Sequence, residues 1–509
     1  MRVHSKLTPE FEGLVASAVE QARADRVFDR LWEHDVTLWA PEGTPEIANR
    51  LGWLRVAEAT LGAIDEIDAF VEEVRGAGMT DVVLLGMGGS SLAPETYRRS
   101  FGNLSPPALR LHVLDSTEPL QVVAVERDIE LDTTLFVVSS KSGGTIEPNS
   151  LFRHFYGLQP DGMHFAAITD PGTQMGQIAS EHGFRRTFVN DPDIGGRYSA
   201  LSYFGIVLAA LAGVDVRSEL NAAVAAQRAS EDESGLYLGA ALGALANAGR
   251  DKLAFVIDPP YQSLGPWAEQ LIAESTGKQG RGVLPIADEP PSQGGPDRVY
   301  LHVRNGETKS PDVGDAPLFT VDVTSLSGLF FDLELATAVL GWALGINPFD
   351  QPNVQQAKDN TSRVLAEGSP DIEDGDFGEL LDGLEPPSYV AIMGYLAYDD
   401  AVDEAVARLR AKLIERHGVA TTWGYGPRCL HSTGQFHKGG PATGRFLQLV
   451  HDDETDAEIP GEEYGFRTLV AAQADGDVQT LRTHGLTTVR VRLAADDLAG
   501  GIDALTARV

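Results

Sequence analysis

The segment TLFVVSSKSGGTIEPNS, residues 134–150, decides the fold of its part of the chain. A β-branched apolar run ends in hydroxyl residues and glycines around one lysine, and a helix-compatible sequence follows. This pattern predicts a buried strand, a polar loop and a helix. Backbone N–H groups and the positive end of the helix dipole favour an anion there. The loop therefore suits a phosphate monoester, although an ordinary serine-rich turn has the same pattern.

A second loop of this kind lies in DVVLLGMGGSSLAPE, residues 81–95. Its glycines allow close backbone approach, and Ser90 supplies a hydroxyl. No Gly-Lys-Ser/Thr follows, so the loop is not a P-loop. It imitates a dinucleotide fingerprint, with Asp115 where a ribose-binding acid would lie, but Ser91 replaces the third glycine. A nicotinamide oxidoreductase is therefore the weakest of the enzyme interpretations.

Short apolar runs alternate with helical stretches along most of the chain, which predicts an α/β fold with parallel sheets wrapped by helices. A helical segment precedes these units, and an extra α/β region follows a Gly/Asp-rich linker at residues 368–378. We expect four parts: an N-terminal helical segment at 1–75, a first domain with the phosphate loops at 76–235, a second domain at 236–370, and a C-terminal α/β region at 371–509.

Composition excludes several classes of function. The 509 residues exceed one ordinary core, and a net charge of −34 with scattered Lys and Arg argues against nucleic-acid binding. The lone Cys429 permits no intrachain disulfide and is expected to be a buried, inert thiol rather than a nucleophile. The longest apolar run, 203–214, is shorter than the roughly 18 residues of a membrane span. The N-terminus has no apolar signal-peptide core, so we expect a cytoplasmic protein without a membrane partner.

Two polar clusters interrupt apolar segments in the middle of the chain. In GGRYS, residues 195–199, glycines would let Arg197 approach a ligand and stabilise an oxyanion, although bracing a loop is an equal alternative. In WAEQLIAESTGKQGRG, residues 267–282, Glu274 lies near the end of a predicted helix, where a carboxylate opposes the dipole. A general base would explain this placement, and a solvated last-turn glutamate is the alternative.

Two later segments carry further polar candidates. Lys358 lies on a predicted helix after a buried one, where most lysines are solvated. The loop GYGPRCLHSTGQFHKGGP, residues 424–441, holds His431 and His437. No Asp or Glu lies in this segment to complete a metal set with them. Proton transfer by a histidine suits the loop better, and no metal or cofactor is expected.

Together these clusters resemble the glucose-6-phosphate isomerase family, from about residue 30 onward. The resemblance rests on five strings: GMGGSSLAPE, SSKSGGTIEP, GGRYS, EQLIAESTGK and GINPFDQPNVQQAK. It implies two sugar-isomerase (SIS) domains, each a parallel sheet sandwiched by helices. The segment 424–441 looks most like the isomerase portion of fused transaldolase/glucose-6-phosphate isomerases, which implies a functional pairing with a separate transaldolase.

The resemblance implies a role for each matching residue. Glu274 would move a proton between C2 and C1, Arg197 would stabilise the enediolate, and Lys358 would assist ring opening with a histidine. The implied phosphate- and sugar-binding residues are Ser90, Ser140, Lys141, Ser142, Thr145 and Gln351. The activity would be metal-free interconversion of glucose 6-phosphate and fructose 6-phosphate, in glycolysis and gluconeogenesis.

The ring-opening histidine departs from the family's pattern. Its H-x-x-x-Q signature normally lies between the glutamate and the lysine in chain order, but here it is His431–Gln435, after Lys358. We favour His431 over His437 on this pattern. In the family this histidine comes from the neighbouring subunit, so a homodimer is implied.

Two related functions remain as alternatives. A dual phosphoglucose/phosphomannose isomerase would share every group named above. A non-catalytic SIS-type sugar-phosphate sensor would keep the two loops but would not need Glu274, Arg197 and a proton-transferring histidine.

Overall fold

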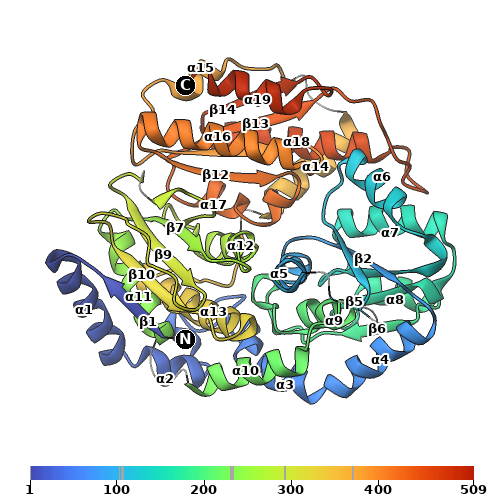
Figure 1. Ribbon diagram of the computed structural model, residues 1–509, viewed down its shortest axis with the longest axis horizontal. Helices are drawn as coiled ribbons and strands as arrows, with labels where there is room; N and C mark the ends of the chain where they lie inside the picture. The colour runs from blue at the N-terminus through green and yellow to red at the C-terminus, as the bar shows by residue number, and fades with distance from the viewer. Residues whose placement is uncertain are drawn as a thin grey trace.

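The computed structural model describes residues 2–102, 104, 108–229, 234–291, 294–352, 354–368 and 372–509; the side chains of 229 and 354–359 are outside this description. The described chain forms three sheets, each with helices against it, and the three units surround a common centre (Figure 1). Their facing edges bring together segments that are far apart in the sequence.

The first sheet is parallel throughout, in the order β3-β2-β4-β5-β6. Its strands are β2 (Asp81–Gly86), β3 (Arg110–Leu114), β4 (Thr134–Ser139), β5 (Phe165–Thr169) and β6 (Arg186–Val189). Its helices are α3 (Val56–Gly62), α4 (Ile64–Gly76), α5 (Leu92–Phe101), α6 (Pro119–Asp128), α7 (Ile146–Leu158), α8 (Gln174–Glu181) and α9 (Tyr203–Leu211). Every residue of β2 and β4 is buried, because helices cover both faces of a parallel sheet.

The second sheet has the order β1-β10-β9-β7-β8 and is parallel except for β1. Its strands are β1 (Val3–Lys6), β7 (Lys252–Ile257), β8 (Leu284–Ile286), β9 (Arg298–Arg304) and β10 (Leu318–Asp322). Its helices are α1 (Pro9–Ala24), α2 (Val27–Trp32), α10 (Val216–Ala229), α11 (Ser234–Asn247), α12 (Leu264–Thr276) and α13 (Leu326–Leu344). The N-terminal segment is thus not wholly helical: β1 joins the sheet edge through backbone pairing, which its polar sequence does not reveal.

The third sheet is parallel in the order β12-β11-β13-β14. Its strands are β11 (Tyr389–Gly394), β12 (Ala420–Tyr425), β13 (Gly444–His451) and β14 (Thr488–Leu493). The helices of this part are α14 (Val354–Glu367), α15 (Phe377–Leu381), α16 (Asp400–His417), α17 (Gly434–Gly439), α18 (Phe466–Thr483) and α19 (Leu498–Thr506). The predicted fold class, parallel sheets covered by helices with an extra C-terminal α/β region, is confirmed. The four domain boundaries stay a prediction.

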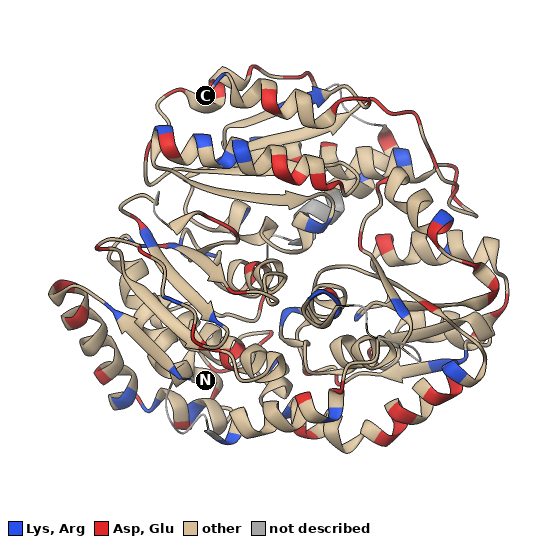
Figure 2. Cartoon of the chain, in the orientation of Figure 1, with Lys and Arg blue, Asp and Glu red and all other residues tan. Residues whose placement is uncertain are grey.

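In the described part of the chain one helix, α13, is long and apolar enough to cross a membrane, but 89% of its apolar window is buried inside the protein. It contacts α10, α11 and α12 and so serves as a core helix of the second unit. Acidic and basic residues lie instead along outward helices such as α1, α4 and α16 (Figure 2).

Candidate active site

The two predicted phosphate loops lie side by side. Strands β2 and β4 are paired, with Gly86 opposite Ser139, so the loops that follow them leave the same sheet edge. A methyl group added to Gly88, whose φ is 55°, would lie 2.9 Å from Gln270 Nε2 and 3.0 Å from the His431 carbonyl oxygen. The backbone of the first loop therefore contacts both α12 and the histidine-bearing loop, which only a glycine allows.

The second loop keeps part of its polar surface open. Ser140 is buried, and its hydroxyl donates to Thr145 Oγ1 at 3.5 Å, whereas Ser142 is exposed. Lys141 turns toward the end of β5: its ammonium pairs with Asp170 and donates to the Pro192 carbonyl at 3.0 Å. Burial raises the pKa of Asp170, and the Lys141 charge opposes that rise. Lys141 thus points at Asp170 rather than into the loop.

Ser90 and Ser91 have different surroundings. Ser90 is 9% exposed, at the end of the short 3-10 turn Gly88–Ser90. The Ser91 hydroxyl donates to Asp115 Oδ2 at 2.9 Å, and the Tyr398 hydroxyl donates to Asp115 Oδ1 at 2.5 Å. Asp115 therefore joins the first sheet to the C-terminal region and does not offer its carboxylate to a ribose.

Glu274 and Arg197 form the buried centre of the site. Glu274 lies in the last turn of α12, 6% exposed, and its Oε2 accepts a hydrogen bond from Gln270 Nε2 at 3.1 Å. Arg197 Nη1 is 3.4 Å from Glu274 Oε1. The Nε of Arg197 donates to Ser275 Oγ at 2.8 Å. The two residues predicted as base and oxyanion stabiliser are thus neighbours, and the solvated-glutamate alternative does not apply.

The turn at residues 347–350 packs against the same cluster. Arg197 Nη2 donates to the carbonyls of Pro348, at 2.6 Å, and Asp350, at 3.0 Å. Lys278 Nζ donates to the carbonyls of Asn347, at 2.7 Å, and Asp350, at 2.6 Å, and lies 2.6 Å from Asp350 Oδ1. Burial, and next the neighbouring Arg197 charge, lower the pKa of Lys278 to about 7, against the opposing effect of Asp350.

His431 reaches this centre from the same chain. Its Nε2 lies 2.8 Å from Glu147 Oε1, which also accepts a hydrogen bond from Gln473 Nε2 at 2.7 Å. Gln473 Oε1 in turn accepts from the Thr117 hydroxyl at 2.6 Å. An ionised carboxylate only accepts hydrogen bonds, so this pair places the ring proton on Nε2 and leaves Nδ1 as the proton acceptor.

The glutamine of the H-x-x-x-Q pattern has a structural partner. Gln435 Nε2 donates to the carbonyl of Gly277 at 2.9 Å, and Gly277 lies three residues after Glu274 in the chain. This hydrogen bond fixes the histidine loop to the end of α12. The pattern therefore anchors the loop of His431 to the end of the helix that carries Glu274, although the histidine follows the glutamate and the lysine in chain order.

His437 belongs to the core of the C-terminal region instead. Its Nδ1 is 2.9 Å from the Tyr389 hydroxyl, and its ring packs against Phe446. Burial lowers the pKa of His437 to about 3, so the ring stays neutral at physiological pH. The geometry places His431, and not His437, with the other site residues.

Two remaining predicted residues come from the segment after α13. Gln351 is exposed, directly after the 347–350 turn that Arg197 and Lys278 hold. Lys358 lies on α14, but its side chain is outside the described part of the chain.

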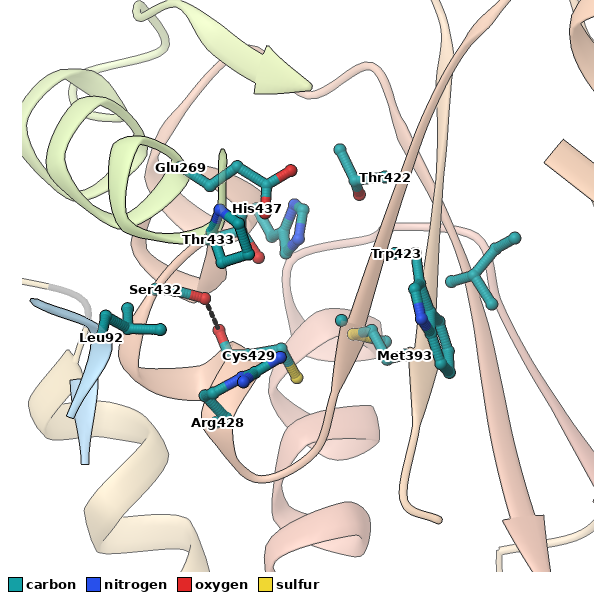
Figure 3. A pocket seen from close by; sticks show the side chains of 13 residues that line it. Leu92, Glu269, Met393, Thr422, Trp423, Arg428, Cys429, Ser432, Thr433 and His437 are labelled. Atoms are coloured by element: carbon teal, nitrogen blue, oxygen red, sulfur yellow. Dashed lines mark hydrogen bonds between the residues drawn. The ribbon is translucent and has the colours of Figure 1, made fainter. Parts of the chain in front are cut away.

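A small enclosed cavity of about 30 Å³ lies behind the site, between α12, α5 and the edge of the third sheet (Figure 3). Glu269, Arg428 and Thr422 are among its polar lining. Burial raises the pKa of Glu269 to about 7. Burial also raises the pKa of Cys429 to about 12, so this thiol is buried and unreactive, as predicted.

Sequence reasoning missed four residues of this site: Lys278, Gln270, Glu147 and Gln473. Lys278 and Glu147 lie inside strings that carried the resemblance, and Gln270 is one helical turn before Glu274, a spacing that places both on one face. Nothing in the local sequence marks Gln473, because its contact with Glu147 spans 326 residues.

Comparisons with known proteins agree with part of this picture. The family model for phosphoglucose isomerase matches residues 59–248. A glucose-6-phosphate isomerase of Acaryochloris marina is 33% identical over 298 residues, 54% of each chain. One of Rubrobacter xylanophilus is 28% identical over 362 residues, 56% of this chain and 83% of the relative. The chain spans about half the length of curated relatives such as those of Acaryochloris and Nostoc.

Solved structures support the fold. A hypothetical protein of Thermus thermophilus superposes with a TM-score of 0.58 at 24% identity, over 71% of this chain and 100% of its own. A glucose-6-phosphate isomerase from Chlamydia trachomatis superposes with a TM-score of 0.53 at 19% identity, over 70% of this chain and 86% of its own.

The family match is shorter than the resemblance predicted. It begins at residue 59 rather than near residue 30, and it ends before Glu274, Gln351 and His431. The loops at 86–91 and 139–145 and the Arg197 string lie within it. Residues 59–248 of this chain therefore match the phosphoglucose isomerase family model, and the remainder of the site lies outside that match.

Proposed function

We propose that this chain is an aldose–ketose isomerase that interconverts glucose 6-phosphate and fructose 6-phosphate through an enediolate. The observation that carries the proposal is the Glu274 carboxylate, 3.4 Å from the Arg197 guanidinium, beside the edge where the two hydroxyl-rich loops meet. A positioned base with a fixed cation next to it is what a proton shift between adjacent carbons needs.

The phosphate of the substrate would bind the loop at residues 139–145 and the N-terminus of α7. Hydroxyls and backbone N–H groups supply donors there, and the helix dipole favours the negative charge. Anchoring the phosphate, remote from C1 and C2, places the reacting carbons near Glu274.

Ring opening would use His431. The Glu147 partner keeps the proton on Nε2, so Nδ1 can take the proton of the sugar's anomeric hydroxyl and later deliver one to the ring oxygen. Lys358 would assist, as the resemblance implies.

Isomerisation would use Glu274 and Arg197. Glu274 removes the C2 proton of the aldose, C1 and C2 become joined by a double bond, and negative charge develops on oxygen. Arg197 stabilises that charge, the hydroxyl proton moves from O2 to O1, and Glu274 returns its proton to C1, so that C2 becomes the carbonyl of the ketose. The proton count is unchanged, and these steps require no metal or cofactor.

A coupled assay of fructose 6-phosphate conversion to glucose 6-phosphate, with and without EDTA, tests the proposal. We expect turnover that EDTA does not change. Mannose 6-phosphate is then tested as a second substrate. Its turnover would favour the dual phosphoglucose/phosphomannose isomerase, and no turnover would exclude that alternative. Absence of turnover with retained sugar-phosphate binding would refute the enzyme and favour the sensor.

The cellular setting is part of this proposal. Similarity to glucose-6-phosphate isomerases supports a cytoplasmic enzyme of glycolysis and gluconeogenesis, and cell fractionation tests its location. The homodimer and the pairing with a separate transaldolase remain proposals from the resemblance. His431 lies beside Gly88 of its own chain, so activity at dilutions that dissociate a dimer would show that a partner's histidine is not required.

A further inference from the structure

The site holds a second buried cation besides Arg197. Lys278 is 3% exposed at its side chain and points into the 347–350 turn. A lysine ammonium in the interior costs several kcal/mol of desolvation unless hydrogen bonds and an opposite charge offset it. The two carbonyls and the Asp350 carboxylate supply part of that offset, so Lys278 carries its charge at pH values below its pKa of about 7.

The Asp350 residue lies between the two cations. Its carbonyl accepts hydrogen bonds from both Arg197 Nη2 and Lys278 Nζ, while its Oδ1 lies beside Lys278 only. Because the carbonyl is 3.0 Å from Arg197, the carboxylate of the same residue is within electrostatic range of the guanidinium. Without Lys278, that carboxylate would partly neutralise Arg197.

Arg197 already has one carboxylate beside it, that of Glu274. Its Nε and Nη2 already donate to Ser275, Pro348 and Asp350, and its Nη1 faces Glu274. A second carboxylate beside it would weaken the field at the position where an enediolate forms.

We propose that Lys278 is a positioning residue for the isomerisation: it holds the 347–350 turn and neutralises the Asp350 carboxylate, so that the Arg197 charge remains available to the enediolate. This inference rests on the isomerase function proposed above.

The variant K278Q separates charge from hydrogen bonding, because the glutamine amide still donates to the turn carbonyls. At about pH 6, where Lys278 is protonated, we expect kcat to fall by about 10²-fold with KM changed less than about threefold, the pattern of an interaction needed only in the transition state. D350N alone should stay within about threefold of wild type. The double variant K278Q/D350N should regain about tenfold over K278Q, because the uncompensated carboxylate is gone.

Lys252→Gln is the matched control. Lys252 is also a buried lysine, 2.6 Å from Asp251, but that pair lies at the start of β7 rather than in the turn. It reports the general cost of removing a buried lysine charge, read as thermal stability, and its kcat should be near that of wild type.

Each outcome decides between specific ideas. Inactive wild-type protein would refute the isomerase function itself. Active wild type with unchanged kcat in K278Q, or a double variant no better than K278Q, would overturn the charge role of Lys278. If K278Q does not fold, K278Q/D350N is compared with D350N: a kcat lower by no more than about tenfold supports the proposal, and a loss of about 10²-fold or more overturns it.

Discussion

The two ends of the candidate site are built differently. Around Glu274 and Arg197 the polar groups are buried and already bonded, Glu274 to Gln270 and Arg197 to Ser275, and Lys278 shares the Asp350 carbonyl with Arg197. Around the loop at residues 139–145, Ser142 is exposed.

This difference indicates which groups of the site need to be held in position before a substrate binds. Groups that act on the reacting carbons gain most from being fixed before the substrate arrives, since their reorganisation would add to the barrier. Groups that bind the phosphate must admit it from water, so an open loop suits them. Substitutions at the bonded end, which is Glu274, Arg197 and their partners, should therefore lower kcat. Substitutions at the open end, which is the loop at residues 139–145, should raise KM.

The largest effect is expected from Glu274→Gln. The amide cannot accept the C2 proton, so kcat should fall by about 10⁴-fold, at the upper end for a general base. Sugar-phosphate binding, measured by calorimetry, should change little because the phosphate loop is remote from the substitution. Full activity in this variant would contradict the base assignment.

His431→Asn should produce the next largest loss, about 10²-fold in kcat, because ring opening loses its proton acceptor. His437→Gln is the matched control, six residues away in the same segment but bonded to Tyr389 in the core. It should alter thermal stability and leave kcat near wild type. Equal losses of kcat in both variants would contradict the choice between the two histidines.

Ser142→Ala tests the open end. One lost hydroxyl donor to a phosphate should raise KM by about tenfold with kcat nearly constant, in line with a hydrogen bond to a charged group. Steady-state kinetics on fructose 6-phosphate measure both constants. A fall in kcat at unchanged KM would place Ser142 at the reacting end instead.

The smallest effect on activity is expected from Glu269→Gln. Glu269 lines the small cavity between α12, α5 and the third sheet. Its carboxyl titrates near 7 in the fold and at 4.5 when unfolded, so folding loses stability as pH rises from about 4.5 to 7, in total about 3 kcal/mol. The glutamine variant should unfold like wild type at pH 4 and resist urea better at pH 8. Equal midpoints at pH 8 would contradict the raised pKa.

The sequence predicted the parallel α/β architecture because its buried strands are continuous apolar runs with polar loops after them. It also predicted a shared site for Glu274, Arg197 and the two loops; the structure places Glu274 beside Arg197 and pairs the strands that precede the loops, and their joint action stays a prediction. It did not predict β1, whose VHSK sequence gains its place only from pairing with β10. Nor could it predict Gln473 or the orientation of Lys141 toward Asp170, because both depend on contacts between segments far apart in the chain.

The hydrogen bond between His431 and Glu147 joins residues 284 positions apart. Closing so long a loop is entropically costly and occurs late when a chain folds. On a ribosome, the protein therefore acquires a complete candidate site only after its third sheet has been synthesised and docked. Newly made chains therefore pass through a period in which the two loops after β2 and β4 exist but the contact between His431 and Glu147 does not.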